Sequence, residues 1–223
     1  LEHLHVAFNH LIEYVGLGDH GVIHCGTGDW NDVLLGFSNR RRRTAKYGES
    51  SLNAGMAATV LPMLADAIET VAPDFAKKLR EFSHAQAKAL RQFWNGKWAA
   101  RGYLGYKDEK LGDDRIFLDT QPWGVLGNVW SQEEQQTLFD NIRTLCVEPQ
   151  RMSARCLWPP VKGLLLDPGS DTHGGTWAAI DTWLTWAWSK FDPRAGWDYF
   201  LRTTMAAHAQ AYPSRPVRWI VAL

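Results

Sequence analysis

SSLNAGMAATVLPMLADAIETV, residues 50–71, is apolar on nearly every face of the helix that it would form. Ser50 and Ser51 supply a helix cap, and Pro62 predicts a kink inside the helix. A helix without a polar face is buried in a larger assembly, so we expect an inner helix here. The next stretch, PDFAKKLREFSHAQAKALRQFWNG at residues 73–96, has its apolar residues on one stripe and predicts an outer, amphipathic helix.

The same alternation of buried and amphipathic helices returns later in the chain. Ser131 and Glu134 form a capping box before an amphipathic helix, and residues 175–190 predict a buried one. Further helices are expected at residues 1–15, at 122–130, and from Asp192 to about Tyr212. Strands are expected at residues 102–106 and 116–118. This pattern predicts an all-α fold, an incomplete (α/α)6 toroid with long loops and a few short strands, as a single domain over residues 1–223.

The composition excludes several classes of partner. Basic and acidic residues number 24 each, so nothing draws the chain toward nucleic acid or acidic membranes, and the run Arg40–Arg43 is too short and isolated to change this. No window is expected to reach the roughly 18 apolar residues of a membrane span, and the first residues do not resemble a signal peptide. Cys25, Cys146 and Cys156 lack disulfide or metal spacing, which predicts buried thiols in a cytoplasmic protein.

Two weak motifs are set aside. His20 and His24 have the spacing of a zinc pair, but Gly21 between them argues against the regular helix that such a pair needs, so no metal is expected. Gly26 and Gly28 lack the third glycine of a dinucleotide-binding loop.

The stretch VIHCGTGDWND, residues 22–32, carries the candidate chemistry. Asp29 and Asp32 flank Trp30, and the chain contains 12 Trp in all, enough to line a core or to floor a sugar site. Inverting cleavage of a glycosidic bond requires a protonated carboxyl group beside the leaving oxygen, and an apolar indole nearby favours the protonated form. The residues alone leave a second interpretation open, because short acidic residues at such junctions often form caps or turns.

With the preceding LEHLHVAFNHLIEYVGLGDHG, this stretch resembles the helix and loop of glycoside hydrolase family 94, the group of cellobiose, chitobiose and cellodextrin phosphorylases and cyclic glucan synthases. GDWND is the most specific part. The likeness continues in order through ESSLNAGMAATVLPMLAD, RIFLDTQPWGVLGN, DTHGGTWAAIDTWLTWAWSKFDP and AHAQAYP, as far as Pro213. It implies inverting phosphorolysis of a β-linked glucoside to a sugar 1-phosphate, with inorganic phosphate as co-substrate and no cofactor.

The resemblance also implies roles for particular residues. Asp32 matches the general acid, and Trp30 matches the residue that lines the subsite of the cleaved sugar. His173 and Gly174 match the phosphate pocket, where a cationic imidazole and helix amides suit an anion, although His173 could instead only cap the helix that follows. The other candidates for substrate binding are Asp29, Asp119, Gln121 and Trp123.

Departures from the family pattern leave alternatives open. Val33 and Leu34 stand where many relatives have Gly and Met, which is expected to reshape the acceptor side. Relatives also have a β-sandwich domain and earlier barrel helices that this chain does not show, so we expect a piece of a longer protein and leave open whether the piece is active alone. The alternatives are an inverting β-glucan hydrolase, with Glu49 or Asp171 as base, and a non-catalytic carbohydrate-binding remnant. Relatives often dimerise, so a homodimer is a further expectation.

Overall fold

The computed structural model describes residues 1–30, 33–106, 109–161, 167–170 and 172–204. Its helices are α1 (Glu2–His10), which continues as a π-helical turn (Leu11–Val15), α2 (Val33–Phe37), α3 (Arg41–Tyr47), α4 (Ser51–Ile68), α5 (Pro73–Leu90), α6 (Gln121–Leu126), α7 (Gln132–Ile142), α8 (Ala178–Phe191) and α9 (Pro193–Thr203). The strands are two residues each: β1 (Glu49–Ser50), β2 (Gly102–Tyr103), β3 (Lys110–Leu111), β4 (Ile116–Phe117) and β5 (Leu157–Trp158). The predicted all-α fold with long loops and a few short strands is confirmed.

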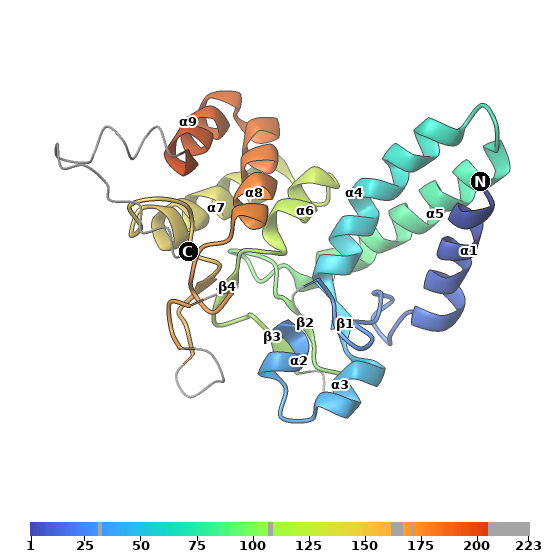
Figure 1. Cartoon of the computed structure of the whole chain (residues 1–223), viewed down its shortest axis with the longest axis horizontal. Coiled ribbons are helices and arrows are strands. Elements are labelled where there is room, and N and C mark those ends of the chain that lie inside the picture. Colours follow the sequence, from blue (N-terminus) through green and yellow to red (C-terminus); the bar gives the residue numbers. More distant parts are fainter. Residues whose placement is uncertain (31–32, 107–108, 162–166, 171, 205–223) are drawn as a thin grey trace, which may run out of the picture.

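Helices α4 and α5 form an antiparallel pair, as the sequence predicts (Figure 1). The side chain of Ser50 accepts a hydrogen bond from the Asn53 amide and caps α4, and Pro62 lies inside this helix. The apolar stripe of α5 buries Phe75 and Leu79 against α4, while its charged residues face outward. The pair therefore has the inner and outer character expected for a toroid of helices.

Helix α6 joins the two groups of helices, because it packs against both α4 and α8. All six of its residues are buried, and Trp123 belongs to the largest hydrophobic cluster. Gly55 of α4 permits this approach, since a Cβ atom there would lie 2.8 Å from the Cβ of Trp123.

Helices α7 to α9 confirm most of the predicted caps. Both hydrogen bonds of the Ser131 and Glu134 capping box are present, and the side chain of Asp192 caps α9. Two expectations are wrong. Helix α9 ends at Thr203 rather than near Tyr212, because Thr204 is already extended. The segment around α8 is not buried throughout, since Trp177 and Trp186 are exposed.

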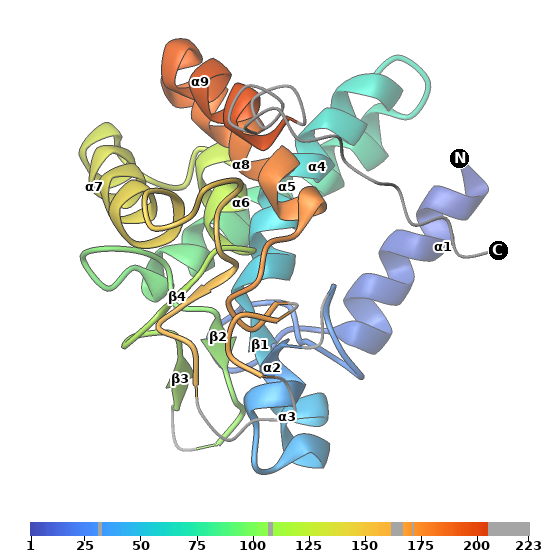
Figure 2. The same ribbon diagram turned by 60° about the vertical axis from the view of Figure 1, so that its left-hand side comes forward.

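The strands and the short helices gather at one end of the longer helices (Figures 1 and 2). β1, β2 and β3 form one antiparallel sheet, and β4 pairs with β5. The sequence predicted β2 and β4 but missed the other strands and helices α2 and α3, because elements of two to seven residues carry too little periodicity to detect.

Helix α4 corrects the expectation about membrane spans. By length and mean hydropathy, 1.2, it is apolar enough to cross a membrane, and it is the one such helix in the described part of the chain. Half of it is buried inside the fold, as in the core helix of a folded protein.

The three cysteines are free and buried, as predicted.

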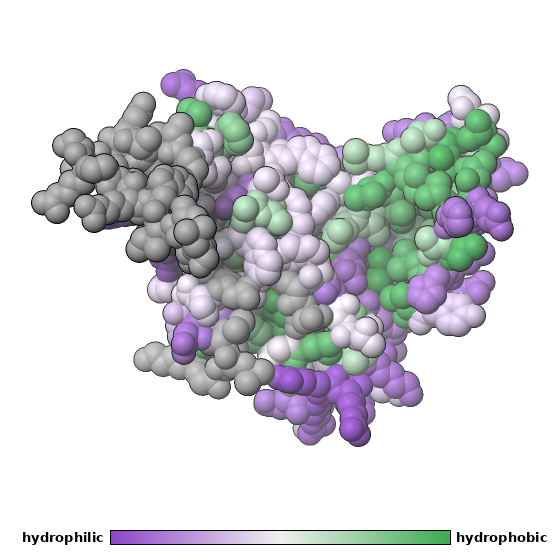
Figure 3. Space-filling view, viewed as in Figure 1, coloured by the Kyte–Doolittle hydropathy of each residue, from purple (hydrophilic) through white to green (hydrophobic). Residues whose placement is uncertain are grey.

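Hydrophobic side chains are not confined to the interior. Figure 3 shows them gathered over the part of the surface formed by α1, α4 and α5. The exposed members on these helices and their ends include Val6, Val60, Met63 and Val71.

Candidate functional site

The loop that leads to Trp30 is held against β1 by backbone hydrogen bonds. The amide of Ser50 donates to the Ile23 carbonyl over 2.9 Å, and the amide of Cys25 donates to the Gly48 carbonyl over 2.8 Å. The side-chain amide of Asn53 donates to the His24 carbonyl over 3.4 Å and ties the loop to α4. Contacts from the end of α3, from β1 and from α4 therefore hold the backbone of this loop in place.

Asp29 lies in a buried ion-pair cluster around Arg101. Nη2 of Arg101 is 2.7 Å from Oδ2 of Asp29, and Nε of Arg101 is 2.9 Å from Oδ2 of Asp119. The hydroxyl of Ser50 donates to Oδ2 of Asp29 over 2.7 Å, and Nη1 of Arg101 donates to that hydroxyl over 3.3 Å. The cluster joins the loop, β1 and the segment before α6 at one point.

The charges of this cluster are taken almost wholly out of water. The side chains of Arg101 and Asp29 have no exposed surface. Burial alone would lower the pKa of Arg101, but the carboxylates of Asp119 and Asp29 outweigh it and raise the pKa, so the guanidinium stays charged. Oδ1 of Asp29 has no hydrogen-bond partner among the described residues. Substrate binding by Asp29 stays a prediction, and Oδ2 of this carboxylate is already paired with Arg101.

Trp30 lies among other indoles. Its ring centroid is 4.6 Å from that of Trp183 and 5.3 Å from that of Trp177, both in edge-on arrangements. Trp123 packs behind Trp183 at 5.2 Å and is almost fully buried. Trp30 itself keeps 37% of its surface exposed. An indole that is held by neighbours and still partly exposed offers a fixed face to a ligand.

Asp32, the predicted acid, lies outside the described residues. Both sides of it are placed, because Trp30 precedes it by two residues and Val33 follows it directly. Val33 is buried and packs with Phe117 and Leu157.

The remaining candidates of the DTQPW segment have different surroundings. Asp119 is buried in the ion pair with Arg101. The Gln121 amide nitrogen donates to the carbonyls of Ala99 and Phe117, and its oxygen accepts from the Ala99 amide. This side chain therefore satisfies backbone groups inside the core. Trp123 buries its ring but leaves Nε1 without a hydrogen-bond partner among the described residues.

His173 is buried at the turn before α8. The Val161 amide donates to Nε2 of its ring over 2.8 Å, which fixes the orientation of the ring. Phosphate binding by His173 stays a prediction. Gly174 follows with φ of 94°, which favours glycine, and a Cβ atom there would lie 3.3 Å from the Leu157 carbonyl oxygen.

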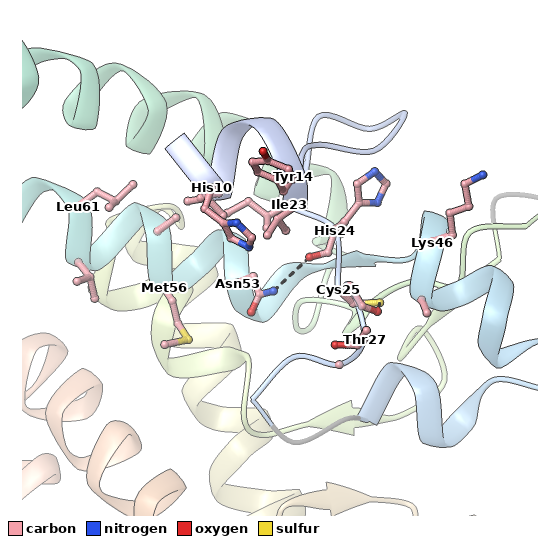
Figure 4. Close-up of a pocket in the computed structure, with 17 residues that line it drawn as sticks. His10, Tyr14, Ile23, His24, Cys25, Thr27, Lys46, Asn53, Met56 and Leu61 are labelled. Atoms are coloured by element: carbon pink, nitrogen blue, oxygen red, sulfur yellow. Dashed lines mark hydrogen bonds between the residues drawn. The ribbon is translucent and has the colours of Figure 1, made fainter. Parts of the chain in front are cut away.

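A cavity of about 830 Å³ opens beside the loop, between the end of α1 and α4 (Figure 4). Gly26, Thr27 and Gly28 line one side of it, and Met56 and Leu61 of α4 line another. None of the indoles around Trp30 belongs to this lining. The ligand site predicted at Trp30 is therefore not part of this cavity.

Glu49 and Asp171 were the candidate bases of a hydrolase. Glu49 is buried, its Oε1 lies 2.7 Å from Nδ1 of His20, and its carboxylate also accepts from the backbone amides of His20 and Val22. A carboxylate enclosed in this way is poorly placed to activate a water molecule. Asp171 lies outside the described residues. In the described part of the chain, no three His, Cys, Asp or Glu side chains gather as a metal ion would require.

Sequence reasoning missed Arg101, Trp177, Trp183 and Trp186 as part of the site. The signal for Arg101 was a single basic residue inside the run WAARGYL, residues 98–104. The signal for the indoles was their number in residues 177–188, which fits a core helix equally well.

Comparison with known proteins gives two findings. The family model described as Glycosyl hydrolase 94 superfamily, catalytic domain, matches residues 1–192. A 3-O-beta-D-glucopyranosyl-beta-D-glucuronide phosphorylase from Paenibacillus borealis is 27% identical over 154 residues, which are 66% of this chain and 19% of that protein. The chain thus spans about a fifth of the length of this curated relative.

Proposed function

We propose that the chain acts in a glycoside phosphorylase that cleaves a β-linked glucoside with inversion. The chain belongs to the glycosyl hydrolase 94 superfamily, whose catalytic-domain model matches residues 1–192. The similar protein from Paenibacillus borealis is named as a phosphorylase of a β-D-glucopyranosyl compound, which supports both the reaction and the β linkage.

In the proposed reaction, Asp32 donates its proton to the glycosidic oxygen while the bond between that oxygen and the anomeric carbon breaks. An oxygen of hydrogen phosphate forms the new bond to the anomeric carbon from the opposite face, which gives an α-sugar 1-phosphate and a free acceptor hydroxyl. The phosphate proton then returns the carboxylate to its acid form. No second protein carboxylate is needed, because phosphate is itself the nucleophile.

One observation carries this proposal: the indole of Trp30 is held by Trp177 and Trp183 and remains partly exposed. Asp32 follows Trp30 in the sequence with only Asn31 between them, as in the family motif. The cluster around Arg101 supports the assignment, because it anchors Asp29 and with it the start of the DWND segment.

For phosphate we propose His173 and Gly174. The ring of His173 is fixed by the Val161 amide, at the turn that leads to α8. Gly174 adopts the positive φ that lets the backbone turn closely at the same point.

The first test is to incubate the protein with β-linked gluco-oligosaccharides, with and without inorganic phosphate, and to identify the released sugar. We expect sugar 1-phosphate that forms only with phosphate present. Free glucose formed without phosphate would instead identify a hydrolase, and binding without turnover would identify a carbohydrate-binding remnant.

The second test concerns the acid. Asp32→Asn removes the donated proton, and we expect turnover to fall by about 10² to 10⁴ while oligosaccharide binding persists. The matched control is Asp113→Asn, which changes an exposed carboxylate on the turn before β4. Full activity of Asp32→Asn would remove this residue from the proposed role.

A further inference from the structure

Another cavity, of about 560 Å³, is formed by α8, α9 and the loop around Met152. Its wall consists of hydroxyl groups, apolar groups and a single charged group among the described residues, the carboxylate of Asp181. None of the described residues that line it has a role in the proposed phosphorolysis. A cavity of this size can hold a small organic ligand.

Asp181 brings a negative charge to this cavity without a cation to balance it. The residue keeps only 6% of its surface exposed, and it lies in the first turn of α8, where the helix amides favour a charged carboxylate. None of the ion pairs between described residues involves Asp181. Because removal of a charge from water is costly, buried carboxylates are almost always paired. The cavity therefore favours a ligand that supplies the missing positive charge.

The two oxygens of this carboxylate have different surroundings. Oδ1 accepts a hydrogen bond from the hydroxyl of Tyr199 over 2.5 Å and another from the Ala154 amide over 3.2 Å. Oδ2 accepts none from the described residues and, unlike Oδ1 of Asp29, is not sealed from solvent. Since Asp181 lines the cavity, Oδ2 is the oxygen that a ligand there can reach.

The hydroxyl groups of the wall complete a set of hydrogen-bond acceptors. Thr182 donates its proton to the Ala179 carbonyl and Thr203 donates its proton to the Phe200 carbonyl, each over 2.7 Å. These hydroxyl oxygens therefore offer only lone pairs to a ligand. Together with Oδ2 they favour a ligand that carries N–H donors on a charged group. Met152 and Phe200 add apolar contact for the rest of the ligand.

We propose that this cavity binds a small organic ammonium ion, a protonated primary amine on a short alkyl body. Its N–H groups donate to Oδ2 of Asp181 and to the threonine oxygens, and its alkyl body contacts Met152 and Phe200. A bare metal ion fits less well, because a cavity of about 560 Å³ is far larger than one ion. In addition, no three His, Cys, Asp or Glu side chains gather in the part of the chain that the structure describes.

The test is a calorimetric titration with butylammonium chloride at constant ionic strength. Two further probes separate the contributions: 1-butanol has the alkyl body without the charge, and tetramethylammonium chloride has the charge without N–H donors. We expect butylammonium to bind saturably and at least about tenfold more tightly than either probe, since charge-assisted hydrogen bonds are the stronger ones.

Two variants test the residues. Asp181→Asn removes the charge but keeps an oxygen for Tyr199 and Ala154, and we expect butylammonium to bind at least about tenfold more weakly while 1-butanol binding is unchanged. Thr182→Val removes one acceptor and leaves the contact between Asp181 and Tyr199 intact, and we expect a loss of about three- to tenfold.

The matched control is Asp140→Asn, which removes an exposed carboxylate of α7 and should leave butylammonium binding unchanged. The proposal is overturned if the parent protein shows no saturable binding, if either probe binds as tightly as butylammonium, or if Asp181→Asn binds like the parent protein. An equal loss in Asp140→Asn would overturn it as well. If Asp181→Asn does not fold, Thr182→Val and the comparison of probes decide, and unchanged binding by Thr182→Val then refutes the proposal.

Discussion

Arg101 is the residue at which the candidate loop is joined to the rest of the fold. Its guanidinium lies between the carboxylates of Asp29 and Asp119 with no access to water. Such a pair contributes little net stability compared with an apolar replacement of the same shape, but the loss of one partner leaves buried charges uncompensated. We therefore expect the Arg101 ion pairs mainly to hold the loop in position. Breaking them should cost more stability than forming them contributes.

The first prediction follows from this burial. Arg101→Ala removes the cation that pairs with both Asp29 and Asp119, and we expect the free energy of unfolding to fall by about 3 to 5 kcal/mol, measured by urea denaturation. The control is Arg80→Ala, whose pairs with Asp66 and Glu69 lie at the surface and should matter little. If Arg101→Ala and Arg80→Ala lose the same free energy of unfolding, burial of the Arg101 cluster does not explain the effect.

The second prediction concerns the thiols. Burial raises the pKa of Cys146 to about 12, so almost no thiolate exists near neutral pH. Cys25 and Cys156 are buried as well. We expect no reaction of the folded protein with a thiol reagent at about pH 8 and complete reaction after unfolding. Lys77→Cys, at an exposed position of α5, provides the control and should react at once. Rapid reaction of the parent protein would refute the prediction.

At the scale of elements, α8 and α9 are joined by a buried polar contact. The hydroxyl of Tyr199 on α9 donates to Oδ1 of Asp181 on α8 over 2.5 Å, and the Ala154 amide donates to the same carboxylate oxygen over 3.2 Å. Burial, and then the neighbouring carboxylate, raise the pKa of Tyr199 far above its usual range. This contact orients the helix that carries Trp183, whose indole packs against Trp30.

The third prediction tests that contact. Tyr199→Phe deletes a hydrogen bond to a charged group, and we expect unfolding to become easier by about 1.5 to 3 kcal/mol in thermal or urea denaturation. Tyr14→Phe, at an exposed position, is the control and should change nothing.

The pH dependence of the same contact has a definite sign. The pKa of Tyr199 is higher in the folded than in the unfolded protein, where it is about 10. The stability that it contributes is therefore fully present below about pH 10 and is lost as the pH rises beyond that value. The difference in stability between the parent protein and Tyr199→Phe should narrow above about pH 10, and a constant difference would contradict the assignment.

At the scale of the whole molecule, exposed hydrophobic residues gather over α1, α4 and α5 (Figure 3). The cavity of about 830 Å³ runs between the end of α1 and α4, and Tyr14 and Val60 belong both to its lining and to the exposed set. Contiguous apolar surface of this kind promotes association or dye binding in water.

The fourth prediction is that charging this surface reduces association. Met63 is 55% exposed on α4, and Met63→Lys keeps a residue with good helix propensity. We expect less binding of a hydrophobic dye and a lower average mass in sedimentation at high protein concentration, with an unchanged unfolding midpoint. Met152→Lys, on the loop after α7, is the control and should leave both readouts unaltered. The predicted homodimer would be excluded if the parent protein sediments as a monomer throughout.

The helices were predictable because their signals are local. Ser131 with Glu134 capped a helix as expected, and the apolar residues 50–71 formed an inner helix against the amphipathic α5. The site was predictable only through GDWND, since the residue types alone were compatible with an ordinary cap. Trp177 was misassigned to the core, because the periodicity of α8 does not reveal which apolar faces lack a neighbour.

The sequence by itself determined the helical class, the family resemblance and the order of the candidate residues, because capping, periodicity and motif spacing act over a few neighbouring positions. Only the tertiary structure decided that Asp29 forms an ion pair with Arg101, 72 positions away along the chain, and that indoles from three segments meet around Trp183. Burial and charge pairing depend on which distant surfaces approach each other, and no local pattern encodes that approach.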